Sequence, residues 1–127
     1  MSKTKQDSFI DHQFKVLMHM STWRQQANCV GLSTDDFYSP DDSDMKKQAA
    51  KYCFGCPVQN QCLYTAIIID ERHGVWGGLT PRQRKSFYKK LKAVAQSKDL
   101  DLDDWDRSVD NFIFQNTSIE DVHNLMH

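Results

Sequence analysis

The residues best suited to chemistry are four cysteines in the pattern C-x23-C-x2-C-x5-C, namely Cys29, Cys53, Cys56 and Cys62. Four thiolates suit a tetrahedral zinc ion or an iron–sulfur cluster. A common zinc ribbon has two C-x2-C pairs, whereas this chain has one pair and two single cysteines. That asymmetry favours a cluster, with zinc as the alternative. Two disulfides or ordinary buried thiols would also use four cysteines, but the close grouping argues against both.

Length and composition indicate one compact domain in a reducing compartment. The chain has 127 residues, of which 39% are hydrophobic and 26% charged, as expected for a single globular domain. No run approaches the ~18 apolar residues that span a bilayer. Residues 1–6 are polar, unlike a signal peptide. We therefore expect a cytoplasmic protein with reduced cysteines and no membrane partner.

Charge is distributed unevenly along the chain. Residues 1–50 carry 6 basic and 7 acidic side chains, residues 51–92 carry 8 and 2, and residues 93–127 carry 2 and 8. The basic middle segment can attract a polyanion. An acidic tail of opposite sign follows it.

Apolar spacing predicts three helices in the first part of the chain. The first covers residues 7–20 and carries one apolar stripe. The second covers residues 44–52, with Asp44 as its cap. The third covers residues 57–70 and opens at Pro57, a residue favoured in a first helical turn. The stripe of the first helix is Ile10, Phe14, Leu17 and Met18, and the buried side of the third is Val58, Cys62, Leu63, Ala66, Ile67 and Ile69.

A glycine-rich turn and a well-capped helix follow. Residues 74–78 read G-V-W-G-G, and glycines accept backbone angles that other residues avoid, so this turn can present Trp76 on a small backbone. Thr80 is placed as the cap of the next helix, Pro81 as its first residue, and Gln83 as the partner in a capping box.

That helix separates into two faces. At about 100° per residue, a basic stripe and an apolar stripe lie on nearly opposite sides. The apolar stripe must dock on the domain, which leaves the basic stripe facing solvent or a polyanion. The basic stripe is Arg82, Lys85, Lys89 and Lys92, and the apolar stripe is Phe87, Leu91 and Val94.

The segment after Ser97 has a different composition. It holds an acidic run around Trp105 and two further amphipathic patterns. We expect three parts in the chain: a helical extension over residues 1–22, a metal domain over residues 23–95, and an acidic tail over residues 96–127 that folds back or binds a partner. The amphipathic patterns are Val109, Phe112 and Ile113, followed by Ile119, Val122, Leu125 and Met126.

These motifs closely resemble the WhiB-like family, the iron–sulfur transcription factors of actinobacteria and of their phages. The resemblance covers about residues 23–92, and the long segments on either side depart from the common pattern, which suits a phage-encoded member. It rests on Cys29, on Cys53-x2-Cys56-Pro57-Val58-x3-Cys62-Leu63-x2-Ala66, and on Gly74-Val75-Trp76-Gly77-Gly78-Leu79-Thr80.

The resemblance implies an all-α domain wrapped around a [4Fe–4S] cluster, with helical extensions at both ends. The implied cluster ligands are Cys29, Cys53, Cys56 and Cys62. It also implies a monomer that binds region 4 of the principal sigma factor of RNA polymerase and that senses redox state or nitric oxide.

In the family, the turn tryptophan and aromatic residues near the first cysteine form the sigma-facing surface. A tyrosine stands here where the family typically has a second phenylalanine, which keeps the ring and adds a hydroxyl. The implied sigma-facing residues are Trp23, Phe37, Tyr38, Gly74, Val75, Trp76, Gly77 and Gly78.

Family members often place basic residues after the turn, against promoter DNA. Such residues neutralise phosphates but carry no sequence information by themselves. A solvated helix face is the alternative, and the acidic tail can compete with DNA for these charges. The residues in question are Arg82, Arg84, Lys85, Lys89, Lys90 and Lys92.

Two other classes of function remain open at this point. A zinc-stabilised protein-interaction module, such as a phage modulator of host transcription, would keep the same ligands without a redox function. An enzyme could use Cys53 and Cys56 as a redox dithiol, but such a motif needs a βαβ context, and helices and turns are predicted here. We therefore expect no catalysis. Because ligand binding contributes folding free energy in small metal domains, we predict that the metal-free chain is partly unfolded over residues 23–56.

Overall fold

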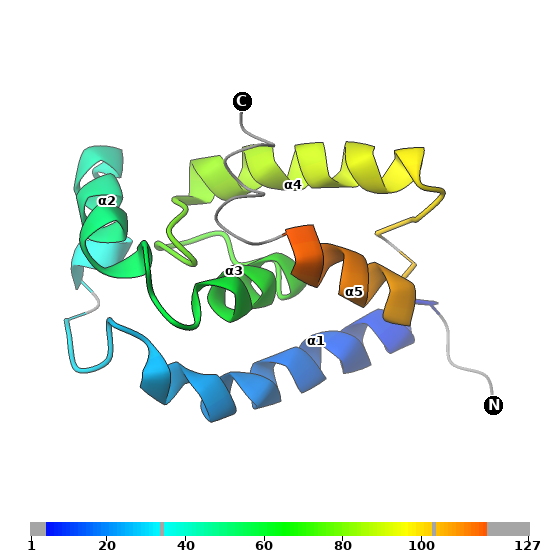
Figure 1. Cartoon of the computed structure of the whole chain (residues 1–127), viewed down its shortest axis with the longest axis horizontal. Helices are drawn as coiled ribbons and strands as arrows, with labels where there is room; N and C mark the ends of the chain where they lie inside the picture. The colour runs from blue at the N-terminus through cyan, green and yellow to red at the C-terminus, as the bar shows by residue number, and fades with distance from the viewer. Residues whose placement is uncertain (1–4, 34, 103, 117–127) are drawn as a thin grey trace.

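The computed structural model describes residues 5–33, 35–102 and 104–116. Over these residues the fold consists of five α-helices without a β-strand, joined by loops and, between α1 and α3, by short helical turns (Figure 1). The all-α expectation is confirmed. None of the described helices is both long enough and apolar enough to cross a membrane. The helices are α1 (Lys5–Trp23), α2 (Asp42–Gln48), α3 (Gln59–Ile68), α4 (Pro81–Ser97) and α5 (Arg107–Asn116).

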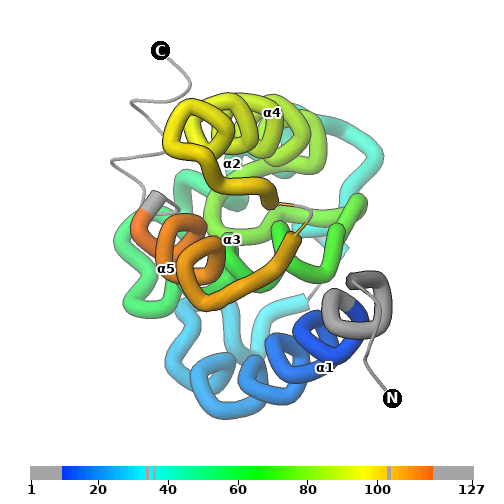
Figure 2. The backbone as a smooth tube through the Cα atoms, turned by 90° about the vertical axis from the view of Figure 1, so that its right-hand side faces the viewer, coloured from blue at the N-terminus to red at the C-terminus, as the bar shows by residue number. Residues whose placement is uncertain are grey.

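Helix α3 lies at the centre of the fold. Figure 2 shows it surrounded by α4, α5 and α1. Leu63 and Ile68 of α3 and Phe87 and Leu91 of α4 are each completely buried, and burial of each such side chain stabilises the fold by about 1.5–3 kcal/mol. The same core receives side chains from both ends of the described chain, namely Val16 from α1, Leu102, and Val109, Phe112 and Ile113 from α5.

Helix α4 begins as its sequence predicts. The Gln83 amide donates to Oγ1 of Thr80 at 3.3 Å, and the Thr80 amide donates to Oε1 of Gln83 at 3.0 Å. Pro81 occupies the first turn. These residues form a capping box, which satisfies backbone donors that a helix start leaves free. This start fixes where the chain leaves the glycine-rich turn.

Helix α1 shows which side of an amphipathic pattern is buried. Gln13 Nε2 donates to the carbonyl of Ile68 at 2.9 Å, and Val16 is only 7% exposed. These contacts turn the predicted apolar stripe away from the core. The four side chains of this stripe are 44–64% exposed: Ile10, Phe14, Leu17 and Met18.

Two predicted helix starts are wrong by a few residues. Helix α2 is capped by Asp41, which accepts a hydrogen bond from the Ser43 amide at 2.9 Å, and the predicted cap, Asp44, lies inside the helix. Helix α3 begins two residues after Pro57. At its C-terminal end Ile68 is completely buried, whereas the sequence predicted Ile69 on the buried side. The short helix predicted around Val109 is confirmed as α5. The last predicted amphipathic pattern, residues 119–126, lies outside the described residues.

Candidate metal centre and its surroundings

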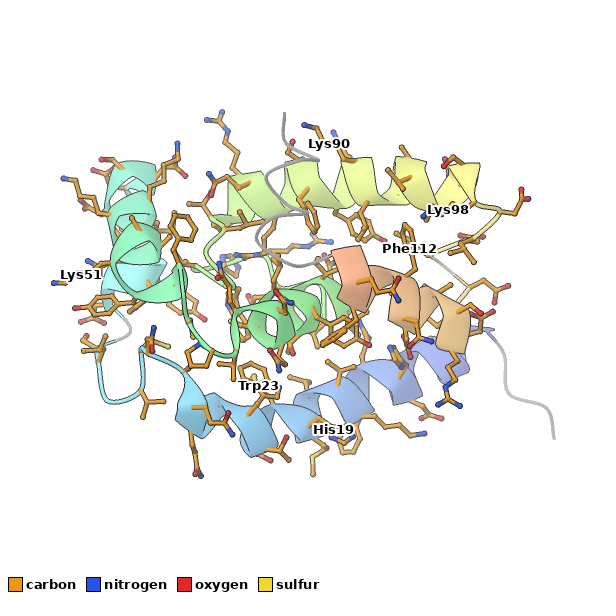
Figure 3. The ribbon with its side chains drawn as sticks, in the orientation of Figure 1. His19, Trp23, Lys51, Lys90, Lys98 and Phe112 are labelled. Atoms are coloured by element: carbon orange, nitrogen blue, oxygen red, sulfur yellow. The ribbon has the colours of Figure 1, made fainter. Side chains whose placement is uncertain are left out.

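All four cysteines line one cavity of about 750 Å³. Cys29 arrives on the loop after a short 3₁₀ turn, and Cys53 ends a π-helical turn (Ala49–Cys53). Cys56 follows in the next turn, and Cys62 is carried by α3. The fold therefore brings Cys29 to the same cavity as the three cysteines that follow it closely spaced in the sequence. Figure 3 shows Trp23 at the end of α1, on the side that faces α3.

Local hydrogen bonds place the cysteine segments. The Cys56 amide donates to the Cys53 carbonyl at 3.0 Å, and Gly55 between them has a φ of 83°, a left-handed angle that favours glycine. Asn28 Nδ2 donates to the carbonyl of Tyr52 at 3.2 Å. The residue before Cys29 is thereby tied to the residue before Cys53.

The thiols are partly desolvated and close enough to influence one another. Burial is the main cause that raises the pKa of Cys62 to about 12 and that of Cys53 to about 11, and the neighbouring thiols raise both further. Backbone amides oppose this effect, and the Gly77 amide donates to Sγ of Cys62 at 3.2 Å. Amide donors to sulfur are an outer-shell feature of metal–thiolate sites. Bound metal cations would remove the repulsion between thiolates.

The four thiols are the candidate ligands of a metal group in this cavity. Among the described residues, no three histidine, cysteine or acidic side chains converge on a position that holds a single metal ion. Yet the four thiols share one cavity. This donor set is consistent with an iron–sulfur cluster bound at all four sulfurs, and four thiolates are also a ligand set for a tetrahedral zinc ion.

The glycine-rich segment forms a tight turn against α3. Trp76 and Leu79 exchange two backbone hydrogen bonds of 3.1 Å, and Gly77 and Gly78 have φ angles of 60° and 87°. Positive φ at both central positions defines a type I′ turn. A Cβ atom at Gly77 would lie 2.8 Å from the backbone of Leu63, so only glycine allows this approach. Gln59, one turn before Cys62 on α3, donates to the Gly77 carbonyl at 3.1 Å.

The structure separates the residues expected to face a partner. Phe37 is buried at 8% exposure, and Tyr38 beside it is 47% exposed. Trp23 and Trp76 are half-buried and line the cavity with them. The backbone of the turn is buried. We call Trp23, Tyr38 and Trp76 the aromatic rim, because they are the expected side chains that solvent reaches at this cavity.

Among the expected DNA-facing residues, Arg84 is placed in the interior. It is only 5% exposed, and its guanidinium donates to four backbone carbonyls of the turn segment. The expectation that Arg84 faces DNA is therefore wrong. A sequence signal did exist, because Arg84 precedes Phe87 by three and Leu91 by seven residues and so lies on the apolar face. Arg82, Lys85 and Lys89 are exposed on the opposite face, whereas Lys90 and Lys92 are half-buried.

Several residues that line the cavity were not assigned to it from the sequence, Gln59 and Leu17 among them. Gln59 is buried and holds the turn, but a single glutamine in a helix gives no signal of that role. Leu17 of α1 also lines the cavity, although it was assigned only to an apolar stripe.

Comparison with known proteins finds a matching family and relatives among transcriptional regulators. Residues 23–87 match the family model described as transcription factor WhiB. The transcriptional regulator WhiB of Streptomyces coelicolor is 36% identical over 67 residues, which cover 53% of this chain and 76% of the relative. WhiB2 of Mycobacterium tuberculosis is 38% identical over 63 residues, covering 50% and 70%.

A third relative is named for its response to redox state. The redox-responsive transcriptional regulator WhiB3 of Mycolicibacterium smegmatis is 30% identical over 74 residues, covering 54% of this chain and 77% of the relative. No solved structure matches the chain. All four cysteines of the candidate centre lie within the matched residues 23–87. The chain therefore belongs to the WhiB family of transcription factors.

Proposed function

We propose that this transcriptional regulator binds a [4Fe–4S] cluster and docks on region 4 of the principal sigma factor through its aromatic rim. Because the family consists of transcription factors, the protein is a regulator and no enzyme. One contact carries the proposal: the Gly77 amide donates to Sγ of Cys62 at 3.2 Å. It joins a candidate cluster ligand directly to the turn that presents Trp76.

Cys29, Cys53, Cys56 and Cys62 would hold the cluster. When bound, the cluster supplies four thiolate-binding irons and a one-electron redox couple. The cysteine side chains hold three segments of the chain together around the cavity. Gly77 and Gly78 orient amides toward the sulfurs of Cys62 and Cys53, which stabilises the thiolate form.

The aromatic rim supplies the proposed contact with sigma. Tryptophan and tyrosine are frequent anchors at protein interfaces because they combine a large apolar area with a polar tip. Trp76 sits on a type I′ turn, and the Tyr38 ring lies against Gly74 of the same segment, where an added Cβ would be 2.6 Å from the ring. The two side chains are therefore held in place before a partner arrives.

The exposed basic side chains of α4 supply the proposed contact with promoter DNA. Arg82, Lys85 and Lys89 are exposed on one face, and phosphate contacts of this kind strengthen binding without selecting a sequence. Sequence choice would then come from sigma. Figure 3 shows Lys90 on the outer side of α4, away from α3.

We further propose a redox response. Cys29 is exposed, whereas the other three cysteines are half-buried, so the Cys29 edge of the cavity is the side that small oxidants reach first. Loss of the cluster would release Cys29 and its loop from α3. The relative WhiB3 is named redox-responsive, and the same property is proposed here for this chain.

The test is anaerobic purification of the full chain, followed by metal, sulfide and absorption measurements. A brown protein with about four irons and four sulfides per chain supports the cluster. Co-purification with sigma region 4 follows, with Trp76→Ala as the variant and Phe114→Ala, an exposed aromatic outside the cavity, as the control. A colourless protein with one zinc ion would contradict the cluster. Equal recovery of sigma by Trp76→Ala would contradict the docking surface.

A further inference from the structure

Arg84 is a buried arginine that joins α4 to the glycine-rich segment. We propose that Arg84 is a positioning residue, which holds residues 71–79 in the conformation that presents Trp76 to the partner. The inference rests on the docking function proposed above. It replaces a contact with DNA by a role inside the fold, and it makes partner binding depend on a side chain that the partner does not touch.

The hydrogen bonds of Arg84 reach both ends of the segment. Nη1 donates to the carbonyls of Gly74 at 2.7 Å and Leu79 at 2.8 Å. Nη2 donates to the carbonyls of Glu71 at 3.2 Å and His73 at 3.1 Å. Residues 71–79 are not helical, so these carbonyls have no helical hydrogen bonds. The Leu79 carbonyl also accepts from the Trp76 amide, and Arg84 supplies a side-chain donor to each of the four. A planar guanidinium offers five donors in a fixed arrangement, which suits acceptors that converge from two directions.

Other contacts hold the same segment from the opposite side. The Val75 amide donates to the Phe37 carbonyl at 2.8 Å, and the Gly77 amide donates to Cys62 as described. These bonds attach the middle of the segment to the cavity wall. Arg84 attaches its two ends to α4. Trp76 lies between these anchors, so its direction depends on both.

The charge of Arg84 is maintained in the interior. Burial lowers the pKa of Arg84 to about 10, and the nearby Glu71 and Cys62 act in the opposite direction. The guanidinium therefore stays charged at neutral pH. Its Nε is buried without a hydrogen-bond partner among the described residues. The four hydrogen bonds from Nη1 and Nη2 to carbonyls therefore replace the water lost on burial. A side chain without a planar guanidinium cannot make all four of these bonds.

The test compares Arg84→Gln with Arg107→Gln, an exposed arginine at the start of α5 to which no binding role is assigned. Amide hydrogen exchange reports on residues 71–79, and calorimetry measures binding to sigma region 4 without DNA. We expect faster exchange at Val75, Gly77 and Leu79 in Arg84→Gln, with α3 and the rest of α4 still protected. Sigma binding should weaken at least about tenfold. In Arg107→Gln both quantities should change by less than about twofold.

A lysine variant and a DNA measurement make the outcome decisive. Arg84→Lys keeps the charge but loses the planar fork, so its exchange and affinity should lie between those of the parent and Arg84→Gln. If Arg84→Gln unfolds throughout, Arg84→Lys decides, and unchanged exchange and affinity in that variant overturn the proposal. So does an Arg84→Gln protein that binds sigma normally but binds DNA less well. If the parent does not bind sigma, the proposed function fails, and the exchange data alone decide whether Arg84 holds the turn.

Discussion

His12 on α1 stacks on Trp105, with ring centroids 5.3 Å apart and an interplanar angle of 24°. Its Nε2 also lies 2.8 Å from Oδ1 of Asp110 on α5, within ion-pair distance although the direction does not meet hydrogen-bond geometry. Tyr64 of α3 hydrogen-bonds the same carboxylate. The N-terminal extension and the acidic tail are therefore joined to each other and to the helix that carries Cys62.

Replacing His12 should weaken this junction. His12→Ala removes the ring that packs on Trp105 and leaves Asp110 without its nearest basic partner, so we expect a loss of about 1–2 kcal/mol in the free energy of unfolding. The measurement is urea denaturation at neutral pH. His19→Ala, an exposed position on the same helix, is the control and should change stability by less than about 0.5 kcal/mol. Equal effects of the two variants would contradict the junction.

The sequence predicts local features of the fold better than it predicts which faces are buried. The capping box of Thr80 and Gln83 depends on residues three positions apart, and it forms as expected. Helix α1 has apolar side chains on two sides, and tertiary contacts of Gln13 and Val16 decide which side is buried. Periodicity within one helix cannot supply that choice.

In the candidate site, too, local features can be predicted from the sequence more easily than contacts between distant segments. The cysteine spacing alone indicates a metal centre, and the glycine-rich turn is readable because positive φ requires glycine. The role of Arg84 is harder to predict, because an arginine after such a turn first suggests phosphate binding. Its place on the face of Phe87 and Leu91 was the available signal. The contribution of Gln59 depends on the distance between α3 and the turn, which no local pattern reports.

Gly77 should tolerate no side chain. A Cβ at this position would meet the backbone of Leu63 at 2.8 Å, and its φ of 60° already disfavours other residues. We expect Gly77→Ala to lower the free energy of unfolding by more than about 2 kcal/mol. Gly31→Ala is the matched control, since Gly31 has a φ of 83° but no atom within 4 Å of its Cβ position, so only the backbone cost of about 1 kcal/mol applies. Similar losses in both would contradict the close packing of the turn on α3.

The reduced metal-free protein should lose stability in alkali. Burial raises the pKa of Cys62 to about 12, whereas an unfolded thiol titrates near ~8.5. Between these values the unfolded chain loses a proton that the folded chain keeps, so the free energy of unfolding falls as the pH rises, by at most ~1.4 kcal/mol per pH unit for this thiol. Urea denaturation between about pH 8 and pH 10 measures the slope. Cys62→Ser removes this titration and should reduce the slope, leaving the part due to Cys53, whose pKa burial raises to about 11. An unchanged slope would contradict the burial of the Cys62 thiol.

Removal of the cluster should loosen the Cys29 segment first. Residues 28–33 are exposed, and Asn28 reaches the π-helical turn by its bond to the Tyr52 carbonyl. Once a chelator removes the metal, we expect faster amide exchange over residues 23–56, while the amides of α3 and α4 in the core stay protected. Exchange rates over residues 23–56 that are the same before and after chelation would contradict a structural role of the proposed cluster in this segment.

The proposed cluster and the turn of Trp76 are expected to form one binding surface for sigma. Calorimetric titration of sigma region 4 with the anaerobic protein, before and after removal of the cluster, tests it most directly. We expect one-to-one binding by the cluster-bound protein and a loss of at least about a hundredfold in affinity after removal, because loosening of residues 23–56 displaces Trp23 and Tyr38 of the aromatic rim. Equal affinity of both forms would show that the aromatic rim, if it binds sigma at all, does so independently of the cluster.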